Sequence, residues 1–149
     1  MKIPISVLVV IYTSNRDVLL IERADRTDFW QSVTGSLDAL DEDLALAATR
    51  EVFEETGIVV DQLPPGSLVN MHHQIEYAIY PEWRSRYAPG VTRNTEHWFS
   101  LQVPVDTQIK LAPREHVGYQ WLPFKEAAKK CFSPSNGQAI MKLFSANRE

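Results

Sequence analysis

The segment from residue 42 to residue 56 constrains the fold most, because it carries the strongest helical pattern in the 149-residue chain. Asp41 or Asp43 can cap its start, and Gly57 stands where a left-handed residue commonly ends a helix. At about 100° per residue, one side of this helix is apolar and consists of Ala45, Ala48, Val52 and Phe53. We therefore predict a helix that packs by this face and presents polar side chains on the other.

The opposite face carries Glu51, Glu54 and Glu55, which are spaced at i, i+3 and i+4. Like charges at this spacing destabilise a helix by about 0.2–0.5 kcal/mol per pair. No Lys or Arg occurs between Arg50 and Arg84, so only Arg50 can offset the repulsion, by pairing with Glu54. Most charge runs are simply solvated faces. A bound cation is the alternative that supplies the missing charge, and Mg²⁺ prefers carboxylate oxygens together with substrate phosphates.

The rest of the chain predicts strands on both sides of this helix. The continuous apolar run at 5–12 is typical of a buried central strand, and 18–23 reads as its hairpin partner. Further extended segments are expected at 29–35, 58–60, 67–80, 97–103 and 119–124, a loop at 86–96, and helices near 124–131 and 136–146. This alternation favours an α/β sandwich, formed as one domain over residues 1–149.

Composition narrows the possible partners and location. The net charge of −4 gives no global attraction to nucleic acid or anionic lipid. No stretch approaches the roughly 20 apolar residues of a membrane span, and the N-terminal apolar run suits a strand better than a signal peptide. Cys131 is the only cysteine, which suggests a cytoplasmic protein with a packed thiol. No His or Cys spacing suggests zinc, and no histidine is assigned a catalytic function.

Residues 35–58 resemble the Nudix box, Gly-x5-Glu-x7-Arg-Glu-U-x-Glu-Glu-x-Gly-U, where U is a bulky aliphatic residue. The matching residues are Gly35, Glu42, Arg50, Glu51, Val52, Glu54, Glu55, Gly57 and Ile58. One feature departs from the pattern, because six residues rather than five separate Gly35 from Glu42. We interpret this as an insertion in the loop before the helix, since an insertion within the helix would rotate the acids by about 100°.

The resemblance implies a Nudix-type α/β/α sandwich with a mixed sheet. It also implies an enzyme that uses Mg²⁺, or Mn²⁺, to hydrolyse a nucleoside diphosphate linked to another group. Glu51 and Glu55 would be metal ligands, and Glu54 a further ligand or a catalytic group that orients water. Arg50 would orient the carboxylates. The implied chemistry is metal-assisted attack of water on phosphorus.

Three further stretches, at 28–36, 86–99 and 133–140, resemble the bacterial branch of this family that removes pyrophosphate from dihydroneopterin triphosphate in folate synthesis. By that likeness Glu115 completes the metal site from outside the box, with Glu96 as the competing candidate. The substrate-binding positions that the likeness implies are Lys2, Arg23, Thr34, Tyr77, Ala78, Ile79, Tyr80 and Ser133. The expected partner is thus a small molecule, with neither nucleic acid nor membrane.

A pterin triphosphate needs flat surfaces for its ring and cations for its phosphates. The aromatic candidates are Trp30, Tyr77, Tyr80, Tyr87, Trp98 and Phe99, and the cationic candidates are Arg23, Arg86 and Arg93. Each of these also suits a core or surface position. Two other functions stay open: a house-cleaning (d)NTP pyrophosphohydrolase, which the same box would serve, and a non-catalytic Nudix-fold module that binds nucleotides.

Overall fold

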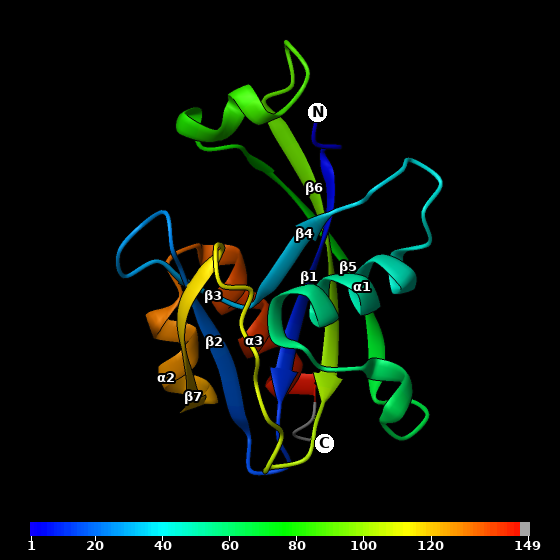
Figure 1. Cartoon of the computed structure of the whole chain (residues 1–149), viewed down its shortest axis with the longest axis vertical. Helices are drawn as coiled ribbons and strands as arrows, with labels where there is room; N and C mark the ends of the chain where they lie inside the picture. The colour runs from blue at the N-terminus through cyan, green and yellow to red at the C-terminus, as the bar shows by residue number, and fades with distance from the viewer. Residues whose placement is uncertain (147–149) are drawn as a thin grey trace.

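The computed structural model describes residues 1–146, which form a mixed seven-stranded sheet packed against helices (Figure 1). The strands are β1 (Ile5–Tyr12), β2 (Asp17–Arg23), β3 (Trp30–Gln31), β4 (Val33–Ser36), β5 (Leu68–Ala78), β6 (Arg93–Gln102) and β7 (His116–Pro123). The helices are α1 (Leu44–Thr56), α2 (Phe124–Lys130) and α3 (Pro134–Ala146), with the 3-10 turns η1 (Val60–Gln62) and η2 (Pro81–Arg86). Within this part of the chain, none of the helices combines the length and apolar character needed to cross a membrane.

Strand β1 is the centre of the sheet, as its apolar sequence predicts. It pairs in parallel with β6 along one edge. Along the other edge it changes partner, pairing with β4 over residues 6–9 and with β2 at Tyr12, both antiparallel. Strands β3 and β7 extend the sheet beyond β2, and β5 extends it beyond β6. The sheet is therefore mixed, as expected.

Alternating residues of β1 supply two separate cores, one on each face of the sheet. Val7 and Val9 pack on the side covered by α1, in a core that includes Ala48. Leu8 points to the other face and packs against α3, in a core that includes Ile140. Figure 1 shows α1 in front of the sheet and α3 behind it. This arrangement confirms the predicted α/β/α sandwich.

The buried face of α1 differs from the predicted one. Ala45 is exposed and Phe53 is 55% exposed, whereas Ala47 is fully buried. Small alanines face the sheet here, and the helix is rotated so that Glu55 is buried at its inner edge. Glu51 and Glu55 therefore do not share an outer solvated face. They point toward the sheet, where a cleft opens.

Two local predictions were also wrong, and one ordered turn was not predicted. Residues 58–60 form no strand; Gly57 ends α1 in the left-handed conformation expected of it (φ 76°), and the chain continues into η1. Strand β6 begins at Arg93, inside the segment expected to be a loop. The ordered turn η2 was not predicted. Asp43 is the N-cap of α1, but its side chain makes no capping hydrogen bond.

Cys131 lies partly buried after α2, and burial raises the pKa of its thiol to about 12. Since only the thiolate reacts, iodoacetamide at pH 8 is expected to label the folded protein at least about tenfold more slowly than the urea-unfolded chain. Mass spectrometry of timed samples measures both rates. Equal rates would show that the thiol is not protected by the fold.

Candidate active site

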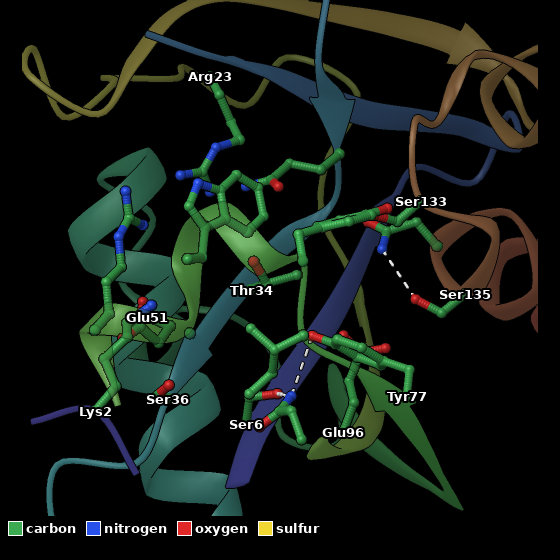
Figure 2. A pocket seen from close by; sticks show the side chains of 18 of the residues that line it. Lys2, Ser6, Arg23, Thr34, Ser36, Glu51, Tyr77, Glu96, Ser133 and Ser135 are labelled. Atoms are coloured by element: carbon green, nitrogen blue, oxygen red, sulfur yellow. Dashed lines mark hydrogen bonds between the residues drawn. The ribbon is translucent and has the colours of Figure 1, made fainter. Parts of the chain in front are cut away.

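A cleft of about 1000 Å³ lies where α1, β4, β5, η2 and the start of α3 approach one another (Figure 2). The residues that the family resemblance assigns to catalysis, to the metal or to substrate binding all line this cleft. They are Lys2, Arg23, Thr34, Arg50, Glu51, Glu54, Glu55, Tyr77, Ala78, Ile79, Tyr80, Glu115 and Ser133. These residues come from segments that are far apart in the sequence, so the fold alone creates their proximity.

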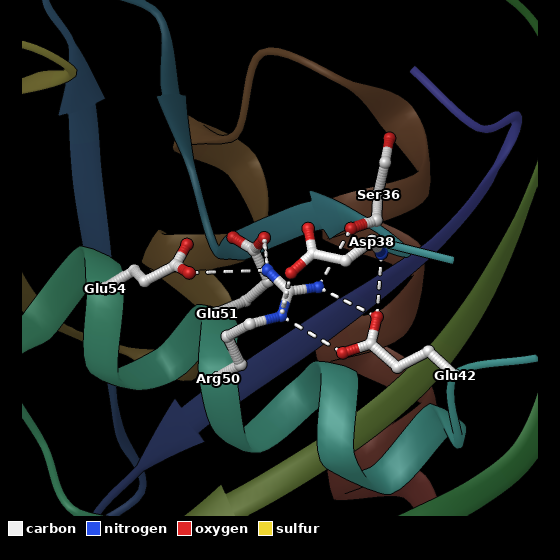
Figure 3. Close-up of polar contacts among 6 residues, drawn as sticks. All are labelled: Ser36, Asp38, Glu42, Arg50, Glu51 and Glu54. Atoms are coloured by element: carbon white, nitrogen blue, oxygen red, sulfur yellow. Dashed lines mark hydrogen bonds and ion pairs between the residues drawn. The ribbon is translucent and has the colours of Figure 1, made fainter. Parts of the chain in front are cut away.

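Arg50 holds the acidic end of this cleft together (Figure 3). Its Nε and Nη2 donate to the two carboxylate oxygens of Glu42 at 3.1 and 3.0 Å. Its Nη1 donates to Glu51 at 2.7 Å, and more weakly to Glu54 at 3.4 Å. The hydrogen bonds to Glu42 and Glu51 raise the pKa of Arg50. Arg50 thus positions Glu51, and the predicted pairing with Glu54 exists as the longest of these contacts.

The loop with the extra residue is fixed at its base. Arg50 Nη2 donates to the carbonyl of Ser36 at 3.1 Å, and the Arg50 Nε pairs with Asp38 Oδ2 at 3.0 Å. The backbone N–H of Asp38 donates to Glu42 at 2.8 Å. Leu40, at the tip, is 77% exposed. Glu42 therefore occupies its place in the Arg50 cluster although the loop is longer than the usual pattern.

Deletion of Leu40 restores the usual spacing, and is expected to leave kcat/KM within about fivefold of the wild-type value, since shortening a surface loop by one residue changes its closure entropy little. Pyrophosphate release under identical Mg²⁺ concentrations measures the effect. Complete loss of turnover would mean that the longer loop is integral to the site.

Glu51 and Glu55 form a pair of carboxylates, of which Glu51 is half-buried and Glu55 is buried. Glu55 is 3% exposed, and within the described residues its Oε1 has no hydrogen-bond partner. Burial raises the pKa of Glu55 well above its usual range, and the charges of Glu51 and Glu115 raise it further. Burial likewise raises the pKa of Glu51. A buried acidic oxygen without a donor is costly, and a cation is the group that would relieve this cost.

Gly35 provides the space that Glu51 occupies. A Cβ at position 35 would lie 2.0 Å from the Glu51 carboxyl carbon. This cradle and the unpartnered oxygen of Glu55 both fit a hard divalent cation, which prefers carboxylate ligands. Among residues 1–146, however, no three acidic, His or Cys side chains already converge on one point. The space at Gly35 and the unpartnered oxygen of Glu55 are therefore the two features of this site that fit a cation.

The structure distinguishes between the two candidates for a further acidic ligand. Glu115 is exposed in the loop before β7, and its charge acts on Glu55. Glu96 instead points to the face of the sheet that carries α3, where its Oε1 accepts a hydrogen bond from Trp98 Nε1 at 3.0 Å. The position of Glu115 suits the acidic cluster better.

One neighbour of the acidic pair was missed in the sequence. His116 is 5% exposed, and its Nε2 lies 3.7 Å from Glu55 Oε1. Burial, assisted by the charge of Arg23, lowers the pKa of His116 to about 4. The ring is therefore neutral at pH 7, and this contact is not an ion pair. No sequence signal identifies it, because the strand register alone places His116 here.

Cations gather beside the acidic pair. The N–H of Lys2 donates to the carbonyl of Arg86 at 2.8 Å, which fixes the N-terminal segment against η2. Arg23 donates twice to Asp25, at 2.8 and 2.7 Å, and lies over the Trp83 ring at 4.5 Å. Burial lowers the pKa of Lys2, and the charges of Arg86 and Arg23 lower it further. Lys2, Arg23 and Arg86 thus lie together in the cleft, and Asp25 pairs with both arginines.

The remaining candidates divide between the cleft and other locations. Tyr87 and Arg86 line the cleft, as do the predicted residues Tyr77 and Tyr80. Trp30, Trp98 and Phe99 are core residues, so the prediction that they stack on substrate is not supported. Arg93 pairs with exposed Glu76 and does not line the cleft. Trp83 lines it but was missed, because η2 was not predicted.

Comparison with known proteins agrees with this geometry. The NUDIX domain family matches residues 2–143. Dihydroneopterin triphosphate diphosphatase of Escherichia coli (strain K12) is 47% identical over 142 residues, covering 93% of this chain and 91% of that protein. The Haemophilus influenzae protein of the same name is 39% identical over 145 residues, covering 96% and 89%. The solved structure of the E. coli dihydroneopterin triphosphate pyrophosphohydrolase has a TM-score of 0.86 at 46% identity, covering 95% of this chain and 94% of that chain.

The family match spans nearly the whole chain, and the relatives are similar over most of their own length. The family match agrees with the box residues found in the sequence and with their arrangement around Arg50 (Figure 3). The chain is therefore a member of the Nudix hydrolase family, whose enzymes generally depend on a divalent metal ion.

Proposed function

We propose that this protein hydrolyses dihydroneopterin triphosphate to dihydroneopterin monophosphate and pyrophosphate, with Mg²⁺ as its usual metal and Mn²⁺ as an alternative. The observation that carries the proposal is the two-ended cleft. One end combines paired carboxylates with cations, and the other is lined by tyrosines and buried polar groups (Figure 2). The relatives with 47% and 39% identity carry the name of this activity.

The cationic end suits the triphosphate. The charges of Arg23 and Arg86 disfavour the charged form of Lys2, and a phosphate chain beside these residues would offset this effect. Arg23 is held by Asp25 and by Trp83, so little side-chain entropy remains to be lost on binding. We assign these three residues to phosphate binding, with Thr34 and Ser133 as further polar contacts in the same cleft.

The acidic end suits the metal. We propose that Glu51, Glu55 and Glu115 hold it, because hard divalent ions prefer oxygen ligands. When bound, such an ion neutralises phosphate charge and makes a nearby water more acidic. Arg50 keeps Glu51 in place through its contacts with both Glu51 and Glu42. Glu54 makes only the long 3.4 Å contact with Arg50, and its side chain is 51% exposed, so we assign it to orienting the attacking water.

The test is to incubate the purified protein with Mg²⁺ and dihydroneopterin triphosphate, or with each dNTP, and to measure pyrophosphate and inorganic phosphate. We expect pyrophosphate release and a higher kcat/KM for the pterin. Equal or better rates on a dNTP would leave the hydrolase chemistry in place and favour a house-cleaning function. Tight binding without turnover would support a non-catalytic module. We further propose a single domain over residues 1–149 that acts in the cytoplasm on this small molecule.

A further inference from the structure

The end of the cleft remote from the acidic helix contains a row of buried polar side chains. Ser6 and Glu96 are opposite each other in the β1–β6 pair, and Tyr77 and Asn94 in the β5–β6 pair. Asn94 and Glu96 are each 2% exposed, yet both line the cleft. Figure 2 shows Ser6, Tyr77 and Glu96 grouped together, with Lys2 and Glu51 at the other side of the cavity.

These buried groups have more acceptors than donors. Glu96 Oε1 accepts from Trp98 Nε1 at 3.0 Å. Burial raises the pKa of Glu96, and hydrogen bonds from Trp98 and Ser135 offset this only in part. Asn94 Nδ2 donates to Ser6 Oγ at 2.7 Å and to Tyr77 Oη at 3.1 Å. This leaves Asn94 Oδ1 buried and without a partner among the described residues. Buried acceptors without donors are costly, so this end of the cleft is suited to a ligand that brings N–H groups.

A metal ion is a poorer occupant of this end. None of the other acidic side chains that line the cleft belongs to this end. Asp38 and Glu54 pair with Arg50, and Asp25 pairs with Arg23. Glu51, Glu55 and Glu115 belong to the acidic end. Hard cations take six or more oxygen ligands and favour several carboxylates. A single carboxylate that already accepts from an indole N–H does not provide that set.

We propose that Glu96 is a specificity-determining residue that accepts two adjacent N–H groups from the heterocycle of the substrate, an inference that rests on the proposed function. A 2-amino-4-oxopyrimidine edge, as in pterin or guanine, presents a ring N–H beside an amino group. An ionised carboxylate accepts from both. Adenine and cytosine place an acceptor beside their amino group, which would face the carboxylate unfavourably. Ile75 and Tyr77 line the cleft near Glu96 and supply surface for the ring of the substrate.

The test compares Glu96→Gln with wild type on substrates that differ only at the 2-position. The first pair is dihydroneopterin triphosphate and its analogue with oxygen in place of the 2-amino group. The second pair, dGTP and dITP, removes the 2-amino group of a purine and leaves hydrogen in its place. Glutamine can still accept from Trp98, but it offers one acceptor and one donor to the ligand. We expect wild type to prefer the amino member of each pair by at least about tenfold in kcat/KM, and the variant to lose most of that preference.

Glu76→Gln is the matched control, because Glu76 is an exposed glutamate of β5 outside the cleft, and it should keep the wild-type ratio. If Glu96→Gln lowers kcat/KM equally for both members of a pair, Glu96 has a structural role and the proposal is overturned. A raised Mg²⁺ requirement in Glu96→Gln would instead indicate a metal ligand and also overturn it. If the variant does not fold, the wild-type protein alone tests the proposal. A wild-type kcat/KM that is about equal for the two members of each pair would reject it.

The two pairs also separate this inference from the proposed function. If only dGTP and dITP are hydrolysed, the pterin substrate is rejected, while the ratio between these nucleotides still tests Glu96. If the pterin is hydrolysed without preference over its 2-oxo analogue, the proposed function stands and the inference about Glu96 fails. If neither pair is hydrolysed, both fail.

Discussion

The Glu55→Gln variant is expected to lose about 10³-fold in kcat at saturating Mg²⁺, because a metal contributes several kcal/mol to the stabilisation of phosphoryl transfer. Glutamine is nearly isosteric with the glutamate but carries no charge. Glu55 is the most buried of the box acids, and its Oε1 has no other partner within the described residues. Its removal should therefore weaken the metal site more than it disturbs packing. Pyrophosphate release over a Mg²⁺ titration measures the loss.

Stability measurements distinguish this effect from misfolding. Since burial disfavours the charged form of Glu55 and raises its pKa, the neutral glutamine should leave the metal-free Tm at pH 8 equal to or above that of wild type. Glu126→Gln, at an exposed position on α2, is the control and should change neither kcat nor Tm. A near-normal rate of Glu55→Gln at saturating Mg²⁺ would remove Glu55 from the set of metal ligands.

Local sequence patterns predicted the parts of this site whose residues lie close together in the sequence. The spacing of Glu51, Glu54 and Glu55 requires only a regular helix, and Gly57 ends that helix in the left-handed conformation. The Arg50 cluster is also largely local, since Arg50 and its acidic partners lie within or just before α1. Such features follow from periodicity and from helix-end preferences, which act over a few residues.

The orientation of α1 was not predictable from apolar periodicity. The rule that large apolar side chains are buried places Phe53 inside, whereas the structure buries Ala47 and Glu55 instead. Small residues allow the helix to pack close to the sheet, and a carboxylate directed into a cleft breaks the usual burial rule. Conflicts of this kind between local pattern and structure are expected at functional sites.

The buried polar end of the cleft depends on strand register. Asn94 and Glu96 lie in a segment whose first part was expected to be a loop, and their neighbours Ser6 and Tyr77 belong to other strands. A shift of one residue in register would turn each of these side chains to the opposite face. The sequence supplies the residue types, but only the assembled sheet places them together.

Replacement of Gly35 by alanine is expected to reduce kcat/KM at low Mg²⁺ by about 10²-fold, of the order seen when the support of a metal ligand is removed. The new Cβ would lie 2.0 Å from the Glu51 carboxyl carbon, so the carboxylate must move. The clash involves the flexible end of a side chain, and Gly35 has no positive φ. The cost should therefore fall on metal binding more than on folding. Calorimetric titration with Mn²⁺ measures the loss of affinity directly.

Gly118→Ala is the matched control for this prediction, because Gly118 also lies in the sheet, in β7, but has room for a side chain. The nearest atom to a Cβ there is Glu22 Oε1 at 3.7 Å, an ordinary contact. This variant should bind Mn²⁺ as wild type does, and should be slightly more stable because alanine loses less backbone entropy than glycine. Partial recovery of Gly35→Ala at high Mg²⁺ would locate its defect in the metal site. Wild-type Mn²⁺ affinity in Gly35→Ala would show that Glu51 does not need its present position, and would contradict its assignment as a metal ligand.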